Sequence, residues 1–236
     1  MQVAFTTLLV TLCMPAQALS FLTMESAPFS YMDPATKEIT GISTEMVAEA
    51  AKRAGIPYSL NLFPWMRTYS LVQADSDKCI YPLARLPERE ALFKWVGPLT
   101  SNKWVLYAKN DFRGTIHNLS DAAKYSIGGV EQEGVTLFLK SHGMNVDVVV
   151  DGKLNLKKLE AHHIDLWATG LATSKAIAAK AGVNNIKVVM ELKSIDHYLA
   201  CNLNVHEETV DMLNQALTTM RNDNWIKKAS ERYPDY

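Results

Sequence analysis

Two successive series of strand-like and helix-like segments constrain the fold of this chain more than any other feature. The first series has apolar strand-like runs at residues 21–24, 58–62 and 79–83, with helical patterns that begin near Ser43 and at Pro64. The second has strand-like runs at residues 125–130, 146–150 and 164–168, with helical patterns at 118–124, 134–142, 154–162 and 174–181. Strands that alternate with helices form parallel sheets with helices on their faces. The sequence therefore predicts an α/β fold with two doubly wound lobes.

The segments that follow the two series complete this organisation. Strand-like runs at residues 186–192 and 197–203 precede two helices, expected at 206–221 and 224–232, that pack back on the first lobe. We expect residues 19–100 and 197–236 to form lobe 1 and residues 101–196 to form lobe 2. A connection of two strands, near residues 98–103 and 194–198, permits hinge closure. Gly97-Pro98 predicts that neither a regular helix nor a central strand passes through that point.

The N-terminal residues predict export. Residues 1–19 carry no charged side chain, and Ala16 and Ala18 supply the small side chains of a cleavage site. These features are typical of a secretory signal peptide, so we expect residues 1–18 to be removed and the mature protein to be periplasmic. A retained anchor stays open as the alternative, and the start of the precursor stays open because the usual basic residues are missing. The rest of the chain has no apolar run of about 18 residues, the length of a membrane-spanning helix.

Charge and cysteine content bound the partners and the redox chemistry. The net charge of −1 indicates neither nucleic acid nor an anionic membrane as a partner. Export would leave two cysteines, Cys79 and Cys201, both in strand-like runs. An oxidising compartment permits a disulfide between them, yet buried free cysteines are also common, so the pattern leaves both states open. A bond would tie the first third of the chain to the last.

Three arginines follow closely after predicted strands. Arg85 and Arg89 come directly after the strand at residues 79–83, and Arg67 lies with Trp65 in the first turn of the second helix. Ligands of open α/β sheets bind at the carboxyl ends of strands, and guanidinium groups pair with anions. We therefore predict an anion-binding cleft between the lobes. The alternatives are a solvated surface cluster, because two glutamates flank Arg89, and a Trp65 that packs on the sheet while Arg67 points outward.

Signatures of catalysis and of cofactors are missing from the sequence. The six histidines are scattered, and no CxxC pair, GxSxG elbow or P-loop is present. The carboxylates of Glu25, Glu131 and Asp165 are candidates for an acid or a base, but no pattern pairs them. The sequence predicts no metal, no cofactor and no catalytic residue.

Several short motifs occur together along the mature chain: Ala27-Pro28-Phe29-Ser30-Tyr31, Gly41-Ile42-Ser43, Arg85-Leu86-Pro87-Glu88-Arg89 and Ile164-Asp165-Leu166-Trp167, followed by the terminal pair of helices. In these motifs the chain resembles the bacterial extracellular solute-binding proteins of family 3, the polar-amino-acid type that serves ABC importers. The resemblance covers essentially the whole mature chain. Two further elements, Pro64-Trp65-Met66-Arg67 and Trp95-Val96-Gly97-Pro98, resemble a subgroup whose ligands are often undefined.

The resemblance implies ligand contacts in the first lobe. Arg89 stands at the position of the arginine that grips the ligand α-carboxylate in the family, which suits a bidentate guanidinium fork. Phe29 and Tyr31 match the aromatic residues that enclose the ligand. Trp65 is expected to add a third apolar wall, and Arg67 and Arg85 to add positive charge.

The second lobe departs from the family pattern at two places. The family has a hydroxyl residue at a helix N-terminus where this chain has residues 131–135, so only Glu131 and backbone donors remain there. The family has an aspartate for the ligand ammonium where this chain has Thr169-Gly170. We expect Trp167 or Thr169 to contact the ligand instead. These departures favour a carboxylate, a phosphate-like anion or a modified amino acid over an ordinary α-amino acid.

Taken together, the resemblance implies a monomeric periplasmic-binding-protein fold of type II. Such a protein captures a small polar or anionic ligand by hinge closure and presents it to an inner-membrane ABC permease or a sensor. Two alternatives stay open. An exported lyase on the same fold would need a buried carboxylate with a raised pKa that faces the cleft. A protein that has lost ligand binding would serve only as a partner for another protein.

Overall fold

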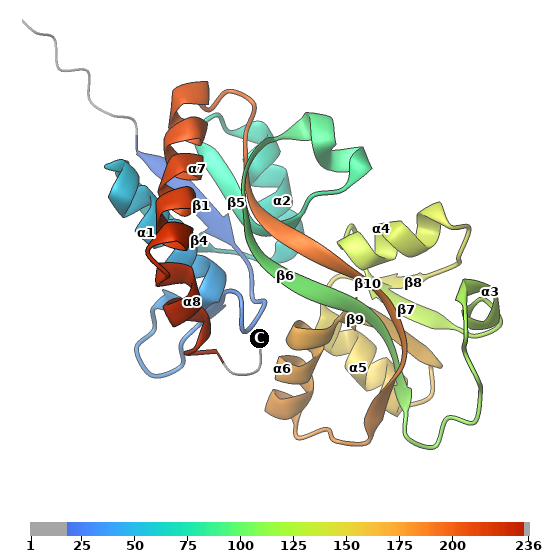
Figure 1. The fold of residues 1–236 in the computed structure, drawn as a ribbon. Coiled ribbons are helices and arrows are strands. Elements are labelled where there is room, and N and C mark those ends of the chain that lie inside the picture. Colours follow the sequence, from blue (N-terminus) through green and yellow to red (C-terminus); the bar gives the residue numbers. More distant parts are fainter. Residues whose placement is uncertain (1–17, 234–236) are drawn as a thin grey trace, which may run out of the picture.

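A single mixed sheet of eight strands runs through both lobes of the computed structural model, which describes residues 18–233 (Figure 1). In spatial order the strands are β4 (Tyr58–Leu62), β1 (Leu19–Thr23), β5 (Lys78–Ala84), β10 (Ile186–Cys201), β6 (Lys94–Lys109), β9 (Leu166–Gly170), β7 (Ile127–Val130) and β8 (Asp147–Val149). The predicted signal peptide, except for Ala18, lies outside the described residues. Within residues 18–233 no helix is both long enough and apolar enough to cross a membrane.

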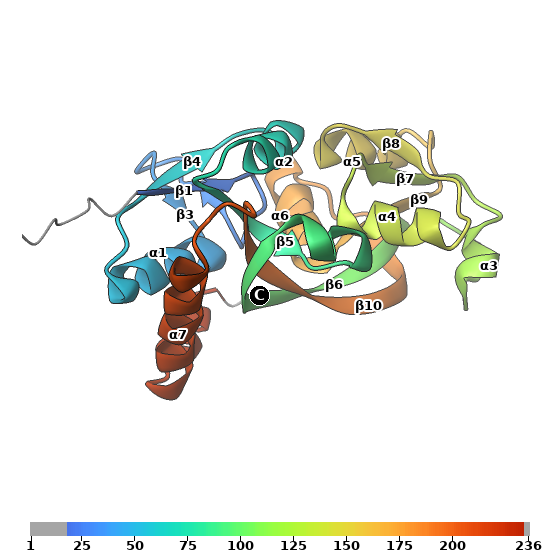
Figure 2. The same ribbon diagram turned by 90° about the horizontal axis from the view of Figure 1, so that it is seen from above.

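The outer strands of the sheet are parallel, and the central strands are antiparallel. In the first lobe β1 pairs in parallel with β4 and β5, and in the second lobe β7 pairs in parallel with β8 and β9. Between them β10 runs antiparallel to β5 and β6, and β6 runs antiparallel to β9. Each lobe therefore has its own parallel core, and the long strands β6 and β10 join the two (Figure 2).

Helices cover both faces of the sheet in each lobe. In the first lobe α1, α7 and α8 share one apolar core, and α2 packs in another on the opposite face. In the second lobe α3 and α4 contribute to one core, and α5 and α6 to the other. The predicted α/β class with two doubly wound lobes is confirmed. The helices are α1 (Ile42–Ala54), α2 (Trp65–Ala74), α3 (Leu119–Ala122), α4 (Gly134–Ser141), α5 (Gly152–Glu160), α6 (Leu171–Ala181), α7 (Glu207–Asn222) and α8 (Trp225–Ser230), together with the 3₁₀ helix η1 (Pro87–Leu92) and a small ribbon of β2 (Tyr31–Met32) and β3 (Ile39–Thr40).

The prediction that Gly97-Pro98 interrupts the strand is wrong. β6 continues through both residues, which lie in an irregular stretch of its pairing with β10, between the pairs Val96–Leu199 and Thr100–His197. Proline is tolerated within a sheet at such a bulge. Helix α7 satisfies the local backbone: Asn214 Oδ1 accepts from Gly97 N at 3.0 Å, and Arg221 Nη2 donates to Pro98 O at 2.6 Å. The two strands expected at 186–192 and 197–203 are likewise one strand, since residues 193–196 stay paired with β6.

The start of α1 shows how the loop after β1 is held. Gly41, rather than Ser43, is the N-cap, and its φ of 116° belongs to glycine. A Cβ at this position would lie 2.5 Å from the carbonyl oxygen of Phe29. That carbonyl accepts from the N–H of Ser43 at 2.9 Å, so the loop itself caps the helix, while the Ser43 hydroxyl lies 3.2 Å from Thr100 Oγ1. The sequence predicts a helix that begins near Ser43, and α1 begins one residue earlier, at Ile42.

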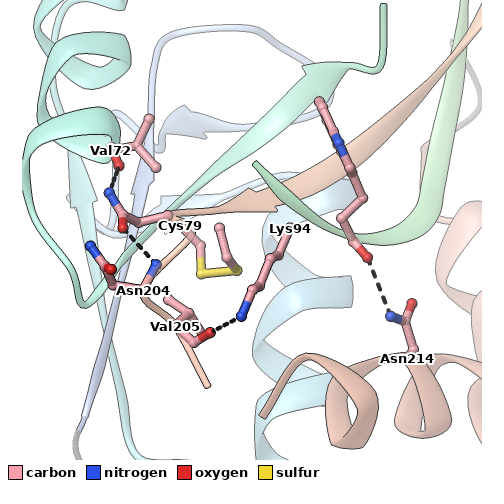
Figure 3. The surroundings of a disulfide bond; sticks show 9 residues. Val72, Cys79, Lys94, Asn204, Val205 and Asn214 are labelled. Carbon is pink, nitrogen blue, oxygen red and sulfur yellow. Dashed lines mark hydrogen bonds between the residues drawn. A yellow bond between two sulfur atoms is a disulfide. The ribbon is translucent and has the colours of Figure 1, made fainter. Parts of the chain in front are cut away.

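A disulfide joins Cys79 of β5 to Cys201 of β10 (Figure 3). The two residues face each other in the antiparallel pairing of these strands, and both are fully buried in the first-lobe core. Asn202, the next residue, donates from Nδ2 to Val72 O at 2.8 Å and ties the end of β10 to α2. The sequence left the state of the cysteines open, and the sheet order decides it.

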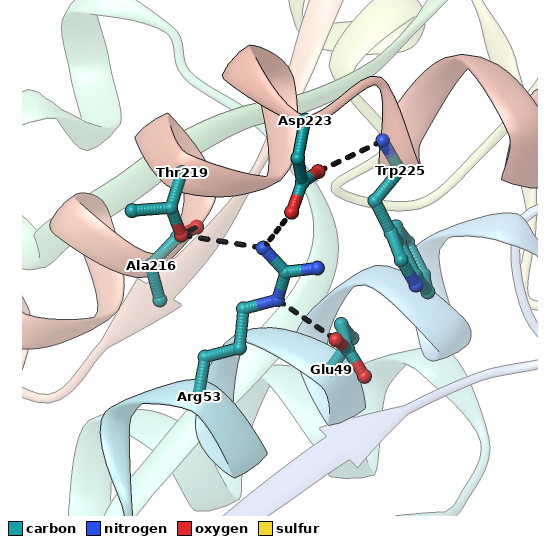
Figure 4. Close-up of polar contacts among 6 residues, drawn as sticks. All are labelled: Glu49, Arg53, Ala216, Thr219, Asp223 and Trp225. Atoms are coloured by element: carbon teal, nitrogen blue, oxygen red, sulfur yellow. Dashed lines mark hydrogen bonds and ion pairs between the residues drawn. The ribbon is translucent and has the colours of Figure 1, made fainter.

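The C-terminal helices dock on the first lobe through polar contacts as well as apolar ones (Figure 4). Arg53 of α1 pairs with Glu49 at 2.7 Å and with Asp223 at 2.5 Å. Asp223 also accepts from the N–H of Trp225 at 3.0 Å, at the turn between α7 and α8. These contacts hold the returning end of the chain against α1, as the sequence predicts for the terminal helices.

Candidate functional site

A cleft of about 1100 Å³ lies between the two lobes. It is lined at the carboxyl ends of the parallel strands, where ligands of α/β sheets bind. From the first lobe it is lined by the loop after β1, the start of α2, the end of β5 and η1. From the second lobe it is lined by the start of α4 and by α5 and α6 along their length, from their first turns to Glu160 and Ala181. The N-termini of three helices thus face the same space, and the partial positive charge of helix N-termini favours anionic groups there.

Four of the residues predicted from the sequence line this cleft: Tyr31, Trp65, Arg89 and Thr169. Trp65 projects from the first turn of α2, and Arg89 comes from η1, directly after β5. Thr169 lies near the end of β9, across the cleft from both. Local sequence placed these side chains after strand ends, and the fold brings them together at one edge of the sheet.

Arg89 bridges the two lobes. Its side chain is 1% exposed, and the guanidinium lies 5.7 Å from the ring centre of Trp65 and 5.3 Å from that of Tyr69. Nη1 donates to Ala84 O at 3.2 Å, while Nη2 reaches across the cleft to Gln132 O at 2.6 Å. Nε is buried and has no hydrogen-bond partner within residues 18–233. A charged fork with unused donors therefore stands at the junction of the lobes.

A second bridge runs beside the first. The indole Nε1 of Trp65 donates to Glu131 O at 2.8 Å. Trp65 and Arg89 thus hold two consecutive carbonyls of the segment that precedes α4. Glu131 contributes its backbone here, and it does not line the cleft. Two of the first-lobe side chains predicted to contact a ligand, Trp65 and Arg89, therefore also hold the lobes together.

Phe29 and Trp167, predicted as ligand contacts, lie in the core instead. Phe29 is 0% exposed and packs edge to face on His197, with ring centres 4.9 Å apart. The loop folds onto α1 through the Phe29 carbonyl, which turns the ring inward. Trp167 is also 0% exposed, because it lies inside β9, two residues before the strand end that reaches the cleft. Neither side chain lines the cleft.

Arg67 and Arg85 also lie away from the cleft. Arg67 is exposed and stacks on Phe63, 4.5 Å from the ring centre. It follows Trp65 by two residues, about 200° around the helix, so the two side chains leave α2 on different faces. Arg85 pairs with Glu90 beside the connecting strands, in a separate depression of about 560 Å³. The predicted cluster of three arginines is therefore reduced to Arg89 in the cleft.

Glu133 is a cleft residue that the sequence pattern did not single out. It is the N-cap residue of α4, half-buried, and lines the cleft. Burial in the cleft raises its pKa to about 7, and the positive charge of Arg89 opposes this rise. The choice between Glu131 and Glu133 depends on where α4 begins. The sequence predicts a helix that begins at Gly134, so Glu133 could have been recognised as the residue at its N-cap position, where a side chain lies close to the helix N-terminus.

Trp104 and Asn102, also not predicted, complete the cleft on β6. Asn102 Oδ1 accepts from the N–H of Ala172 at 3.2 Å and so orders the start of α6. A Cβ on Gly134 would lie 2.7 Å from Cζ2 of Trp104, so the start of α4 packs directly on this indole. The end of β5, which also lines the cleft, is apolar: Pro82, Leu83 and Ala84.

Comparisons with known proteins agree with this architecture. Residues 20–235 match the family model described as bacterial extracellular solute-binding proteins, family 3. The L-cystine-binding protein TcyA of Bacillus subtilis (strain 168) is 20% identical over 206 residues, which cover 87% of this chain and 76% of that protein.

Solved structures match across almost the whole chain. A histidine kinase sensor domain with similarity to periplasmic binding proteins has a TM-score of 0.84 at 13% identity, and the match covers 92% of this chain and 96% of the other. The arginine-, lysine-, histidine-binding protein ArtJ of Geobacillus stearothermophilus has a TM-score of 0.81 at 16% identity, with 93% and 96% covered. These structures share the two-lobed type II fold with the chain described here. This chain therefore belongs to the bacterial extracellular solute-binding proteins of family 3.

Proposed function

We propose that this protein is a periplasmic receptor that closes its two lobes on a small polar or anionic ligand, an amino acid or a related carboxylate. The observation that carries the proposal is the position of Arg89. Its guanidinium is buried between two aromatic rings at the junction of the lobes and retains an unpartnered Nε. A carboxylate suits such a fork because it accepts two parallel N–H bonds.

Closure would follow from contacts on both sides of the cleft. In the proposed division, residues 19–100 and 197–236 move against residues 101–196, and β6 and β10 serve as the hinge. Arg89 and Trp65 favour the closed form through their bonds to the segment before α4. A ligand that also touches both lobes would shift the population further toward this form.

The similar proteins support an amino acid as the ligand and two candidate classes of partner protein. TcyA is a cystine-binding protein, and ArtJ binds arginine, lysine and histidine. The similarity to a kinase sensor domain supports a sensor as partner, and the importers that family members serve support an ABC permease. We propose export by the N-terminal signal peptide and delivery of the ligand to one of these inner-membrane partners.

A thermal-shift screen of the mature chain against amino acids and organic acids tests this function. A ligand at about a hundred times its Kd adds roughly 2.7 kcal/mol of stability, which raises Tm by about 5 to 10 °C for a chain of this size. Binding should be lost in Arg89→Ala and weakened at least tenfold in Arg89→Lys, which keeps the charge without the fork. Arg67→Ala is the matched control, because Arg67 is exposed and outside the cleft.

Two results would contradict the proposal. One is full affinity in both folded Arg89 variants, and the other is the absence of any stabilising ligand in the panel. A second candidate function is a lyase, because Glu133 supplies a cleft carboxyl with a raised pKa. Recovery of the bound ligand unchanged after prolonged incubation would rule out the lyase, while conversion of the ligand would replace the binding function with it.

A further inference from the structure

Asn102 brings an unused hydrogen-bond donor to the cleft on the connecting strand β6. It lies just before the part of β6 that pairs with β9, and its side chain is 8% exposed and lines the cleft. Oδ1 accepts from the N–H of Ala172 at 3.2 Å. Because an amide can accept only through its oxygen, this bond fixes the orientation of the group and leaves Nδ2 as the free end. Within residues 18–233, Nδ2 makes no hydrogen bond.

A glycine beside Asn102 keeps space for this donor. A Cβ on Gly170 would lie 2.3 Å from Nδ2, so any side chain there would displace the amide. The φ of Gly170 is −82°, which every residue type can adopt, so the backbone does not require glycine at this position. The glycine therefore serves the placement of the Asn102 amide rather than the path of the chain.

The groups around Nδ2 offer an apolar wall and further donors. Trp104, the pairing partner of Gly170 on β6, supplies the wall. Gly170 is the N-cap of α6, and the first N–H groups of a helix are donors with partial positive charge. A largely buried amide N–H is costly without an acceptor, and a cation is disfavoured beside a helix N-terminus. This corner of the cleft therefore favours an oxygen acceptor.

We propose that Asn102 Nδ2 donates to an uncharged oxygen of the ligand, so that Asn102 selects a carboxylate that also carries a hydroxyl or carbonyl oxygen. This inference rests on the proposed function, because it adds a second contact to the ligand whose carboxylate Arg89 receives.

A continuous wall joins the two contacts. Arg89 donates to Ala84 O, and Gly134 packs on both Ala84 and Trp104. The Trp104 backbone in turn pairs with Gly170, beside which Nδ2 lies. A ligand that lies along this wall reaches the charged fork with its carboxylate and the amide with its second oxygen.

The experiment uses pairs of carboxylates that differ at one oxygen. 3-Phenyllactate with 3-phenylpropionate tests a hydroxyl next to the carboxylate, and threonine with valine tests a hydroxyl on a side chain. Calorimetry gives the affinity ratio of each pair for the mature wild type and for folded variants. Asn102→Asp keeps the acceptor for Ala172 but replaces the donor with an oxygen. Gly170→Ala leaves Asn102 in place and displaces its amide.

Asn118→Asp is the matched control. Asn118 also uses Oδ1 to accept from a backbone N–H at the start of a helix, that of Asp121 at 2.9 Å. It is exposed and does not line the cleft. The same substitution at this position should therefore leave the affinity ratios unchanged.

Support for the proposal is a wild type that binds the member with the extra oxygen roughly tenfold more tightly in at least one pair. This ratio should fall to about one in Asn102→Asp and in Gly170→Ala, and either variant is sufficient if the other does not fold. If ligands bind and respond to Arg89→Ala, but the wild type shows no such preference or Asn102→Asp keeps it, the role of Asn102 is refuted and the receptor function stands. If no member of either pair binds the wild type, the receptor function is refuted, and the role of Asn102 with it.

Discussion

Removal of the disulfide should destabilise the first lobe strongly. The perturbation is the double substitution Cys79→Ala and Cys201→Ala, which removes the bond and leaves no free thiol in the mature chain. The two residues are 122 positions apart, so the bond closes a loop that contains the whole second lobe. Its absence gives the denatured chain far more conformational freedom, while β5 and β10 remain neighbours in the native sheet.

The magnitude follows from the length of the closed loop. Loop-closure entropy for this separation corresponds to about 5 kcal/mol at 25 °C. For a chain of about 220 residues, each kcal/mol shifts Tm by about 2 to 4 °C, so Tm should fall by about 10 to 20 °C. Alanine in place of the buried sulfurs adds only a small packing loss.

Urea unfolding of wild type and variant, followed by far-UV circular dichroism, measures the difference in the free energy of unfolding. Wild type unfolded with and without a reductant gives the same contrast without any mutation. Agreement of the two values assigns the effect to the bond rather than to packing. A loss below about 1 kcal/mol in both experiments would refute the loop-entropy argument, because the denatured chain would then be constrained by other means.

The remaining predictions concern closure and pH. Trp65→Phe keeps an aromatic ring but removes the indole N–H that donates to Glu131 O, so the closed form should lose about 0.5 to 1.5 kcal/mol. The radius of gyration of the unliganded protein should then rise in small-angle scattering, and an unchanged radius would contradict the bridging role. Burial lowers the pKa of His197 to about 4, below the 6.5 of the unfolded chain. The imidazole of His197 is therefore harder to protonate in the folded state than in the unfolded state. Its contribution to the free energy of unfolding is fully present above pH 6.5 and should fall by roughly 2 to 3 kcal/mol as pH drops to 4.5. The test compares urea unfolding of Glu133→Gln with that of the double variant Glu133→Gln/His197→Gln, and only the double variant should lack this loss of stability at low pH. Glu133 is replaced in both because its raised pKa changes stability with pH in the opposite direction.

The positions of most elements could be predicted from the sequence, because the spacing of apolar residues is a local property. The strand at residues 58–62 is found at those residues, and the first lobe's helices begin next to the glycine and proline that mark them. The placement of Arg89 after a buried strand is local in the same way. The family resemblance, carried by such short motifs, is confirmed by the match over residues 20–235.

What the sequence could not decide depends on contacts between distant segments. Gly97-Pro98 continues a strand because β10 pairs with β6 on both sides of an irregularity there, and the cysteines are bonded because β5 and β10 are neighbours. The family resemblance made Phe29 a ligand contact, yet the loop turns its side chain into the core.

In the cleft, the sequence by itself determined which charged side chains follow strand ends and helix starts. The tertiary structure decided which of them meet, because that depends on the approach of the two lobes. Only this approach brings Arg89 to the carbonyl of Gln132, 43 residues along the chain, and leaves Glu133 half-buried beside it. The burial of these side chains and their hydrogen-bond partners come from segments far apart in the sequence, so no local sequence pattern predicts them.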